Sequence, residues 1–287
     1  MMLMMLGETL AILTAIMWAV STVLSAKALK KVDPIRSNAI KTLSSALIMI
    51  PIVLVTGDLS NLFNTDLNAL FLVVLAAMIG FGIGDTLLFK SIILMGVSRA
   101  YTIVYTSPLF TMVIAVIFLK EPFLLKYLLG TVLVVLSLII ISLEKDKNHR
   151  GISLKGAMMA LISALCWAIG TILVALGLKG ISVFLANTIR FAVLALFLFL
   201  ASKPRKKWEI AGKDLAVLSA SGIIGMVLGG ITFLFSLQMI GASRATPLSS
   251  SSPIWASIIS SIFLKERVTI RLLLSSIIVT IGIYFLI

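Results

Sequence analysis

Long apolar runs, separated by short polar connections, follow one another along the whole chain. Each run is roughly 20 residues long, enough for a helix to cross a hydrocarbon core about 30 Å thick. Because the connections are short, each helix is expected to lie antiparallel to the next. The pattern therefore predicts an all-α integral membrane protein with ten transmembrane helices, at residues 8–29, 35–56, 67–93, 98–119, 123–143, 155–178, 182–201, 213–239, 243–264 and 269–286.

One polar stretch, residues 144–154, divides this pattern into two halves of five helices each. Residues 1–143 form the first predicted repeat, and residues 155–287 form the second. Because five is an odd number, a duplicated half must insert upside down relative to the first. The sequence thus predicts an inverted-topology repeat joined by a cytoplasmic linker.

The two halves share residues at matching positions. The stretch Gly96–Pro122 returns as Gly241–Arg267, sharing G-x-S-R-A, a Ser-Pro pair and a closing F-L-K-E at a constant spacing. Trp18-Ala-Val-Ser-Thr22 likewise returns as Trp167-Ala-Ile-Gly-Thr171. Since Arg, Pro, Lys and Glu recur as well as apolar residues, composition alone does not explain the match.

Composition agrees with a membrane protein, because the chain is 60% hydrophobic, 12% charged, and has a mean hydropathy of +1.19. The net charge of +13 sits mainly in the connections between spans, which argues against nucleic acid as a partner. Most of the 24 Lys and Arg residues fall on one side of the expected topology. That side is predicted to be cytoplasmic, which places both termini outside a plasma or inner membrane.

The chain holds one cysteine and one histidine. An intrachain disulfide and a histidine metal cluster are therefore impossible within one copy. The sequence also lacks a metal-binding carboxylate pair, a zinc motif and a glycine-rich phosphate loop in a polar segment. We expect no cofactor, no metal and no enzymatic activity.

Charged side chains within spans are costly, so each one is a candidate functional residue. Lys41 on the second span and Asp85 on the third lie at similar depth and could pair, either lining a cavity or locking two helices together. Arg190 is the repeat counterpart of Lys41, and inversion moves it to the other side of the midplane. Two such cations would suit an anionic or zwitterionic substrate; the alternative is that Arg190 packs against helix carbonyls.

Polar and aromatic side chains near the middle of spans complete the candidate substrate-binding set: Trp18, Asn38, Tyr101, Tyr105, Ser107, Trp167, Asn187 and Ser252. An indole at that depth needs a partner for its N–H, so either a cavity-facing or a packed position is open for both tryptophans. Pro108 and Pro253 each remove a backbone donor in mid-span and are candidate hinges, or else static kinks.

Small and acidic residues of the repeats are assigned structural roles. The paired glycines at Gly80 and Gly84, repeated at Gly225 and Gly229, predict close helix contacts. Glu121 and Glu266, which end the two F-L-K-E motifs, are expected to interact with the exposed N–H groups of the next helix.

Ten spans, a tryptophan in the first helix of each half, and Ser-Pro followed by F-L-K-E resemble the EamA-type members of the drug/metabolite transporter superfamily. The likeness covers essentially the whole chain as two EamA repeats. It implies a basket of two five-helix halves around a central cavity, alternating access, and often export of amino acids or other small metabolites. Small four-helix relatives use a membrane-embedded Glu in their first helix, whereas Glu8 lies at the edge of the span here.

We therefore predict a secondary transporter that exports small metabolites, such as amino acids or related carboxylate-bearing solutes. A multidrug antiporter that exchanges lipophilic cations for protons, using Asp85, is the alternative, and a scaffolding role is the weaker choice. The expected partners are a small-molecule substrate and the lipid bilayer, with protons open as a coupling ion. A monomer or a weak homo-oligomer is expected.

Overall fold

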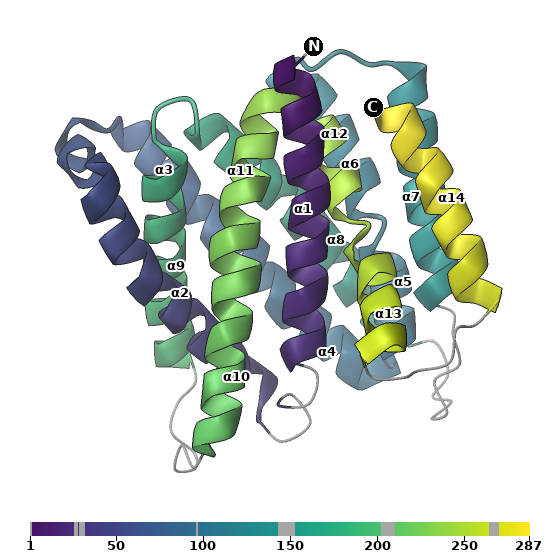
Figure 1. The fold of residues 1–287 in the computed structure, drawn as a ribbon, viewed down its shortest axis with the longest axis horizontal. Coiled ribbons are helices and arrows are strands. Elements are labelled where there is room, and N and C mark those ends of the chain that lie inside the picture. The colour runs from purple at the N-terminus through teal and green to yellow at the C-terminus, as the bar shows by residue number, and fades with distance from the viewer. Residues whose placement is uncertain are drawn as a thin grey trace.

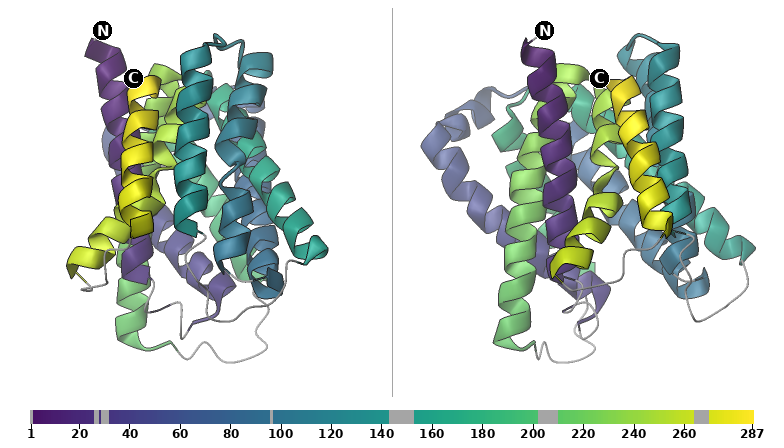
Figure 2. Two further views of the ribbon diagram at one scale, coloured as in Figure 1. Left: turned by 90° about the vertical axis from the view of Figure 1, so that its right-hand side faces the viewer. Right: turned by 45° about the vertical axis from the view of Figure 1, so that its right-hand side comes forward.

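The computed structural model describes residues 2–25, 28, 32–95, 97–142, 153–201, 210–263 and 270–287. Within these ranges the chain is helical, with no strand. Figure 1 shows the helices side by side in one bundle, with both chain ends at the same end of it. The turned views in Figure 2 show the same arrangement. Most of the predicted linker, including His149, and the second acidic end, Glu266, lie outside the described residues.

The first half contains α1 (Met2–Ser25), α2 (Pro34–Thr56), the 3-10 helix η2 (Asp58–Asn64), α3 (Leu67–Ala77), the π-helix η3 (Met78–Gly84), α4 (Asp85–Met95), α5 (Val97–Val104), α6 (Ser107–Ile114), the π-helix η4 (Ala115–Leu119) and α7 (Leu125–Ser142). The second half contains α8 (Leu154–Gly177), α9 (Val183–Ala201), α10 (Gly212–Gly222), the π-helix η5 (Ile223–Leu228), α11 (Gly229–Ile240), α12 (Ala242–Ser249), α13 (Ser252–Phe263) and α14 (Ile270–Leu286).

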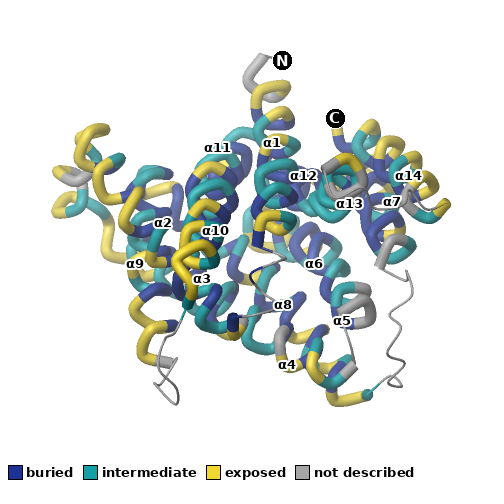
Figure 3. The backbone as a smooth tube through the Cα atoms, turned by 60° about the horizontal axis from the view of Figure 1, so that its bottom comes forward, coloured by how far each residue is buried: buried dark blue, intermediate teal, exposed yellow. Residues whose placement is uncertain are grey.

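Six continuous helical segments of the described chain are long and apolar enough to cross a membrane: Met5–Ser25, Ile35–Thr56, Leu67–Leu94, Leu154–Gly177, Val183–Leu200 and Gly212–Ile240. Three shorter apolar helices are Ser107–Leu119, Leu125–Ile140 and Leu273–Leu286. Large apolar side chains are exposed along the outer helices α2, α9 and α14, as lipid contact requires (Figure 3). An all-helical fold of multi-pass character is thus confirmed, whereas the number of ten spans stays a prediction.

The two spans that carry Ser-Pro are not continuous helices. The span expected at 98–119 is broken at a turn between α5 and α6, and the span expected at 243–264 is broken between α12 and α13. In each break a hydroxyl donates to a carbonyl that also accepts the N–H of the same residue: Thr106 Oγ1 donates to Ile103 O, and Ser251 Oγ donates to Leu248 O, both at 2.7 Å. Each break precedes its proline, since Pro108 and Pro253 lie in the first turn of the following helix, a position that suits proline.

The glycines predicted to make close contacts do so, in matching pairs. A Cβ built on Gly84 would lie 2.9 Å from Trp167 Cδ1, and one built on Gly229 would lie 2.9 Å from Trp18 Cδ1. Gly80 likewise faces the Cα of Gly170. Because each tryptophan packs on the glycine of the opposite half, the two halves use the same contact twice.

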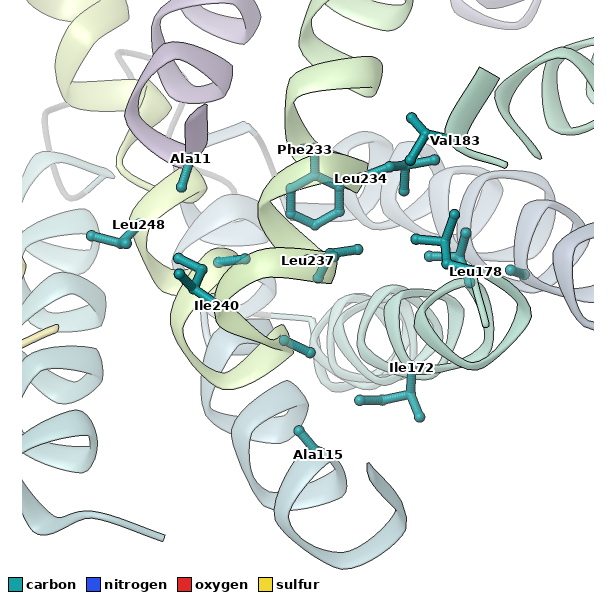
Figure 4. Close-up of a cluster of buried hydrophobic side chains, with 14 of the residues drawn as sticks. Ala11, Ala115, Ile172, Leu178, Val183, Phe233, Leu234, Leu237, Ile240 and Leu248 are labelled. Carbon is teal, nitrogen blue, oxygen red and sulfur yellow. The ribbon is translucent and has the colours of Figure 1, made fainter. Parts of the chain in front are cut away.

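The first helix of each half is exchanged between the halves. Helix α1 packs against α10, η5, α11, α12 and α13, all from the second half. Helix α8 packs against α3, η3, α4, α5 and α6, all from the first half. The main apolar core accordingly draws on both halves, from Ala11 and Ala115 to Phe233 and Leu248 (Figure 4).

Candidate functional site

Asp85 and Trp167 join the two halves through a hydrogen bond within the bundle. Asp85 begins α4, directly after the π-helix η3, and Trp167 lies in the middle of α8. The indole Nε1–H of Trp167 donates to Asp85 Oδ1 at 2.9 Å. The Trp167 N–H thus has an acceptor, but the sequence did not identify Asp85 as that acceptor.

The expected pairing of Lys41 with Asp85 needs correction. The two side chains interact electrostatically, yet they form no ion pair within 4 Å in the part of the chain that the structure describes. The direct partner of the carboxylate is the neutral indole of Trp167. Asp85 is thus oriented by a hydrogen bond and balanced from farther away by a cation, so it can still receive a proton or a positively charged group.

Tyr101, within α5, interacts with this carboxylate, and Tyr105, in the turn that follows α5, lies next to Tyr101. Their rings are 5.4 Å apart at 35° to one another. Tyr101 also interacts electrostatically with Asp85 and packs, together with Trp167, on one small apolar cluster. The structure therefore brings together four of the predicted residues, Tyr101, Tyr105, Asp85 and Trp167, around the first helix break.

Arg190 and Asn187 form a second buried polar group, on α9. Only 6% of Arg190 is exposed and none of Asn187. Arg190 Nη1 donates to Asn187 Oδ1 at 3.2 Å, and the guanidinium lies 5.1 Å from the centre of the Phe81 ring. The partners of Arg190 in the described part of the chain are thus an amide and a ring, and not the helix carbonyls of the packing alternative.

Two donors of this group have no hydrogen-bond partner among the described residues: Arg190 Nε and Asn187 Nδ2. No carboxylate in the described ranges lies within 4 Å of the guanidinium. Leaving a buried donor unsatisfied costs about 1–3 kcal/mol, and more when the group is charged. The arrangement suits an acceptor with negative charge, because both open donors come from one turn of α9.

Phe81 connects the two polar groups. It lies in η3, four residues before Asp85, which is about one helical turn. The Arg190 guanidinium packs on its ring, while Asp85 follows on the same helix. Phe81 therefore links the Arg190–Asn187 group on α9 to the segment of the first half that carries Asp85.

The remaining predicted residues occupy separate places. The Trp18 ring packs on Phe233 with centroids 5.3 Å apart. Asn38 is half-buried on α2, one turn before Lys41. Ser107 is buried at the start of α6, and Ser252 is half-buried at the start of α13. His, Cys, Asp and Glu residues form no metal-binding group of three or more in the described ranges.

Similar proteins give this arrangement its context. A protein of Archaeoglobus fulgidus, described as an uncharacterized transporter, is 27% identical over 283 residues, covering 98% of both chains. An uncharacterized transporter of Clostridium kluyveri is 24% identical over 285 residues, covering 96% of this chain and 91% of that protein. A crystal structure with 14% identity matches at a TM-score of 0.80, covering 97% of this chain and 95% of that chain. That likeness shows the fold.

The model of the EamA-like transporter family matches the chain twice, at residues 5–143 and 154–287. The two matched segments flank the polar linker and together take in nearly every residue. The chain therefore belongs to the EamA-like transporter family.

Proposed function

We propose that this protein is a secondary transporter that exports small carboxylate-bearing or zwitterionic metabolites, such as amino acids, by alternating access through a central cavity between the two repeats. The observation that carries the proposal is the pair of open, buried donors on Arg190 and Asn187. A carboxylate offers two acceptor oxygens in one plane, and a guanidinium recognises that geometry well.

Asp85 complements this anion-binding group. A carboxylate held by one indole N–H retains acceptor capacity for a substrate ammonium. The Tyr101 and Tyr105 rings beside it would add cation–π attraction for the same charge. Both polar groups together favour a small zwitterion, with its carboxylate at Arg190 and its amine at Asp85.

Lys41 and the helix breaks fit the same proposal. Lys41 balances Asp85 electrostatically while no substrate amine is bound. The interrupted helices α5–α6 and α12–α13 resemble the broken helices that surround substrate sites in repeat transporters. We assign Pro108 and Pro253 to the hinges of these breaks, Ser107 and Ser252 with Trp18 and Asn38 to the cavity wall, and both termini to the outer face.

A second candidate is a proton-coupled exporter of lipophilic cations. It is favoured by the placement of Asp85 among Trp167, Tyr101 and Tyr105, a carboxylate within an aromatic surround. In that case Asp85 would bind either the cation or a proton, and Arg190 would have no role in recognition.

The test is efflux from proteoliposomes loaded with a mixed pool of amino acids and metabolites, with and without a proton gradient. The native protein is compared with Arg190→Lys, Asn187→Ala and Asp85→Asn. Lys179→Gln is the matched control, because it removes an exposed cation from the same repeat. Selective efflux of zwitterions that falls in Arg190→Lys and Asn187→Ala supports the proposal.

Two outcomes contradict it. Zwitterion efflux that survives both α9 variants unchanged would remove Arg190 and Asn187 from recognition. Movement of lipophilic cations alone, abolished only in Asp85→Asn, would establish the second candidate instead.

A further inference from the structure

Glu121 lies at the end of the first F-L-K-E motif and binds the N-terminus of α12. The Ala242 N–H donates to Glu121 Oε1 at 2.6 Å, and the Ser243 N–H donates to Oε2 at 2.9 Å. The Ser243 hydroxyl donates to the same Oε2. The expectation that Glu121 would cap the next helix along the chain is wrong, since α12 belongs to the other half.

Gly241 makes this approach possible. Its φ of 78° is in the left-handed region, which favours glycine. A Cβ at this position would lie 2.8 Å from each of the three atoms of the Glu121 carboxylate. The glutamate of the first F-L-K-E motif therefore packs against the glycine of the second G-x-S-R motif and accepts hydrogen bonds from its serine.

Arg244, the arginine of the same G-x-S-R motif, contacts α1, α7 and the C-terminal end of α14. It is 3% exposed and forms an ion pair with Glu8 on α1. Its Nε donates to Leu286 O of α14 at 2.7 Å, and its Nη2 donates to Ile287 O at 3.2 Å. Its guanidinium also lies 5.0 Å from the centre of the Tyr127 ring on α7.

All these contacts gather at the end of the bundle where both chain ends lie (Figure 1). They join the connection between η4 and α7 to α12, and α12 in turn to α1, α7 and α14, so both repeats take part. A carboxylate on a helix N-terminus is stabilised by the open N–H groups and by the helix dipole. The contacts are strong when dry, and water can replace them at this end of the bundle if the helices separate.

Resting on the alternating access proposed above, we propose that Glu121, Gly241, Ser243 and the Glu8–Arg244 pair form a latch that holds this membrane face closed. The latch must break when the cavity opens to that face. It assigns a role to the second G-x-S-R motif and to the glutamate of the first F-L-K-E motif, which do not belong to the candidate substrate site.

The latch can be tested without a substrate, by cysteine labelling. In a Cys166→Ser background, Thr246→Cys places a reporter on α12, one turn inside Ser243, at a position that is 7% exposed. Tyr101→Cys places a second reporter at the repeat counterpart of Thr246, toward the opposite face. Lys179→Cys, exposed at the face of the latch, shows which face a membrane-impermeant maleimide reaches.

Each reporter is combined with Glu121→Ala, with the better space-matched Glu121→Gln, and with Ser243→Ala. Losing charge-assisted hydrogen bonds is expected to raise the labelling rate of Thr246→Cys about tenfold in Glu121→Ala, and less in Ser243→Ala. The labelling rate of Tyr101→Cys should fall at the same time, because opening one face closes the other. Lys120→Gln, which changes the exposed neighbour of Glu121, should leave both rates as they are.

An unchanged Thr246→Cys rate in both Glu121 variants would overturn the latch. A rise at both reporters together would also overturn it, because that result indicates a loosened fold rather than a gate. Since labelling needs no transported solute, either failure is distinct from a failure of the proposed substrate class.

Discussion

Substitution of Gly222, at the end of α10, tests how closely α10 packs against α2 at Lys41. A Cβ at this position would lie 2.5 Å from Lys41 O and 2.9 Å from Lys41 Cα. Ordinary contact begins at 3.4 Å, so the substitution Gly222→Ala requires α10 and α2 to separate by about 0.9 Å. The neighbouring atoms are backbone, which cannot rotate away as a side chain would.

The expected cost follows from two opposing terms. Overpacking of this kind costs about 1–3 kcal/mol. Replacing a helical glycine by alanine returns about 0.5–1 kcal/mol. Because the clash is with backbone, we expect a net destabilisation of about 1–2 kcal/mol. At about 2–4 °C per kcal/mol, the melting temperature should fall by about 2–8 °C.

The assay is thermal unfolding in detergent, followed by tryptophan fluorescence. Gly212→Ala is the matched control, since Gly212 lies on the same helix and an added Cβ there meets no atom within 4 Å. This control should melt at the native temperature or slightly above it. A Gly222→Ala protein that melts no lower than native would refute the close approach of α10 to Lys41, and an equal loss in both variants would assign the effect to the helix itself.

Three further outcomes are expected. Trp167→Phe removes the donor to Asp85 at little change in volume, so proteoliposome efflux should fall while the melting temperature changes little. Gly241→Ala forces a side chain into the left-handed region and against a carboxylate, which should cost at least about 1–3 kcal/mol in detergent unfolding. Glu8→Ala leaves Arg244 buried without its acid and should cost about 3–5 kcal/mol by the same measurement, whereas a cost below 1 kcal/mol would argue against a dry ion pair.

The hydrophobic pattern predicted the helical fold well, because a helix in lipid must be long and apolar, and both properties are local. The same is true of Trp167, since an indole in mid-span needs an acceptor for its N–H whatever surrounds it. Its partner could not be found that way. Asp85 lies on a helix distant in the chain. Its negative charge suggested the cation Lys41 as its partner, whereas the fold places the Trp167 indole within hydrogen-bond distance of its carboxylate.

Helix interruptions were predicted only in part. The Ser-Pro pairs marked the correct spans, but the turns precede the prolines, because proline is well placed in the first turn of a new helix. The π-helices η3 and η5 contain Gly80 and Gly225, which give no specific signal for such a segment. The Glu121 contact was assigned to the wrong helix for a similar reason, since it depends on how the two halves meet.

The exchange of α1 and α8 between the halves bears on biogenesis and ancestry. During synthesis α1 enters the membrane long before α10 to α13, its neighbours, have been made, so it must persist there without its final packing. Neither half buries its own first helix. A single ancestral half would have completed its core by exchanging that helix with a second copy, as in a domain-swapped dimer. Gene fusion would then have joined the two copies of a dimer that already had this interface.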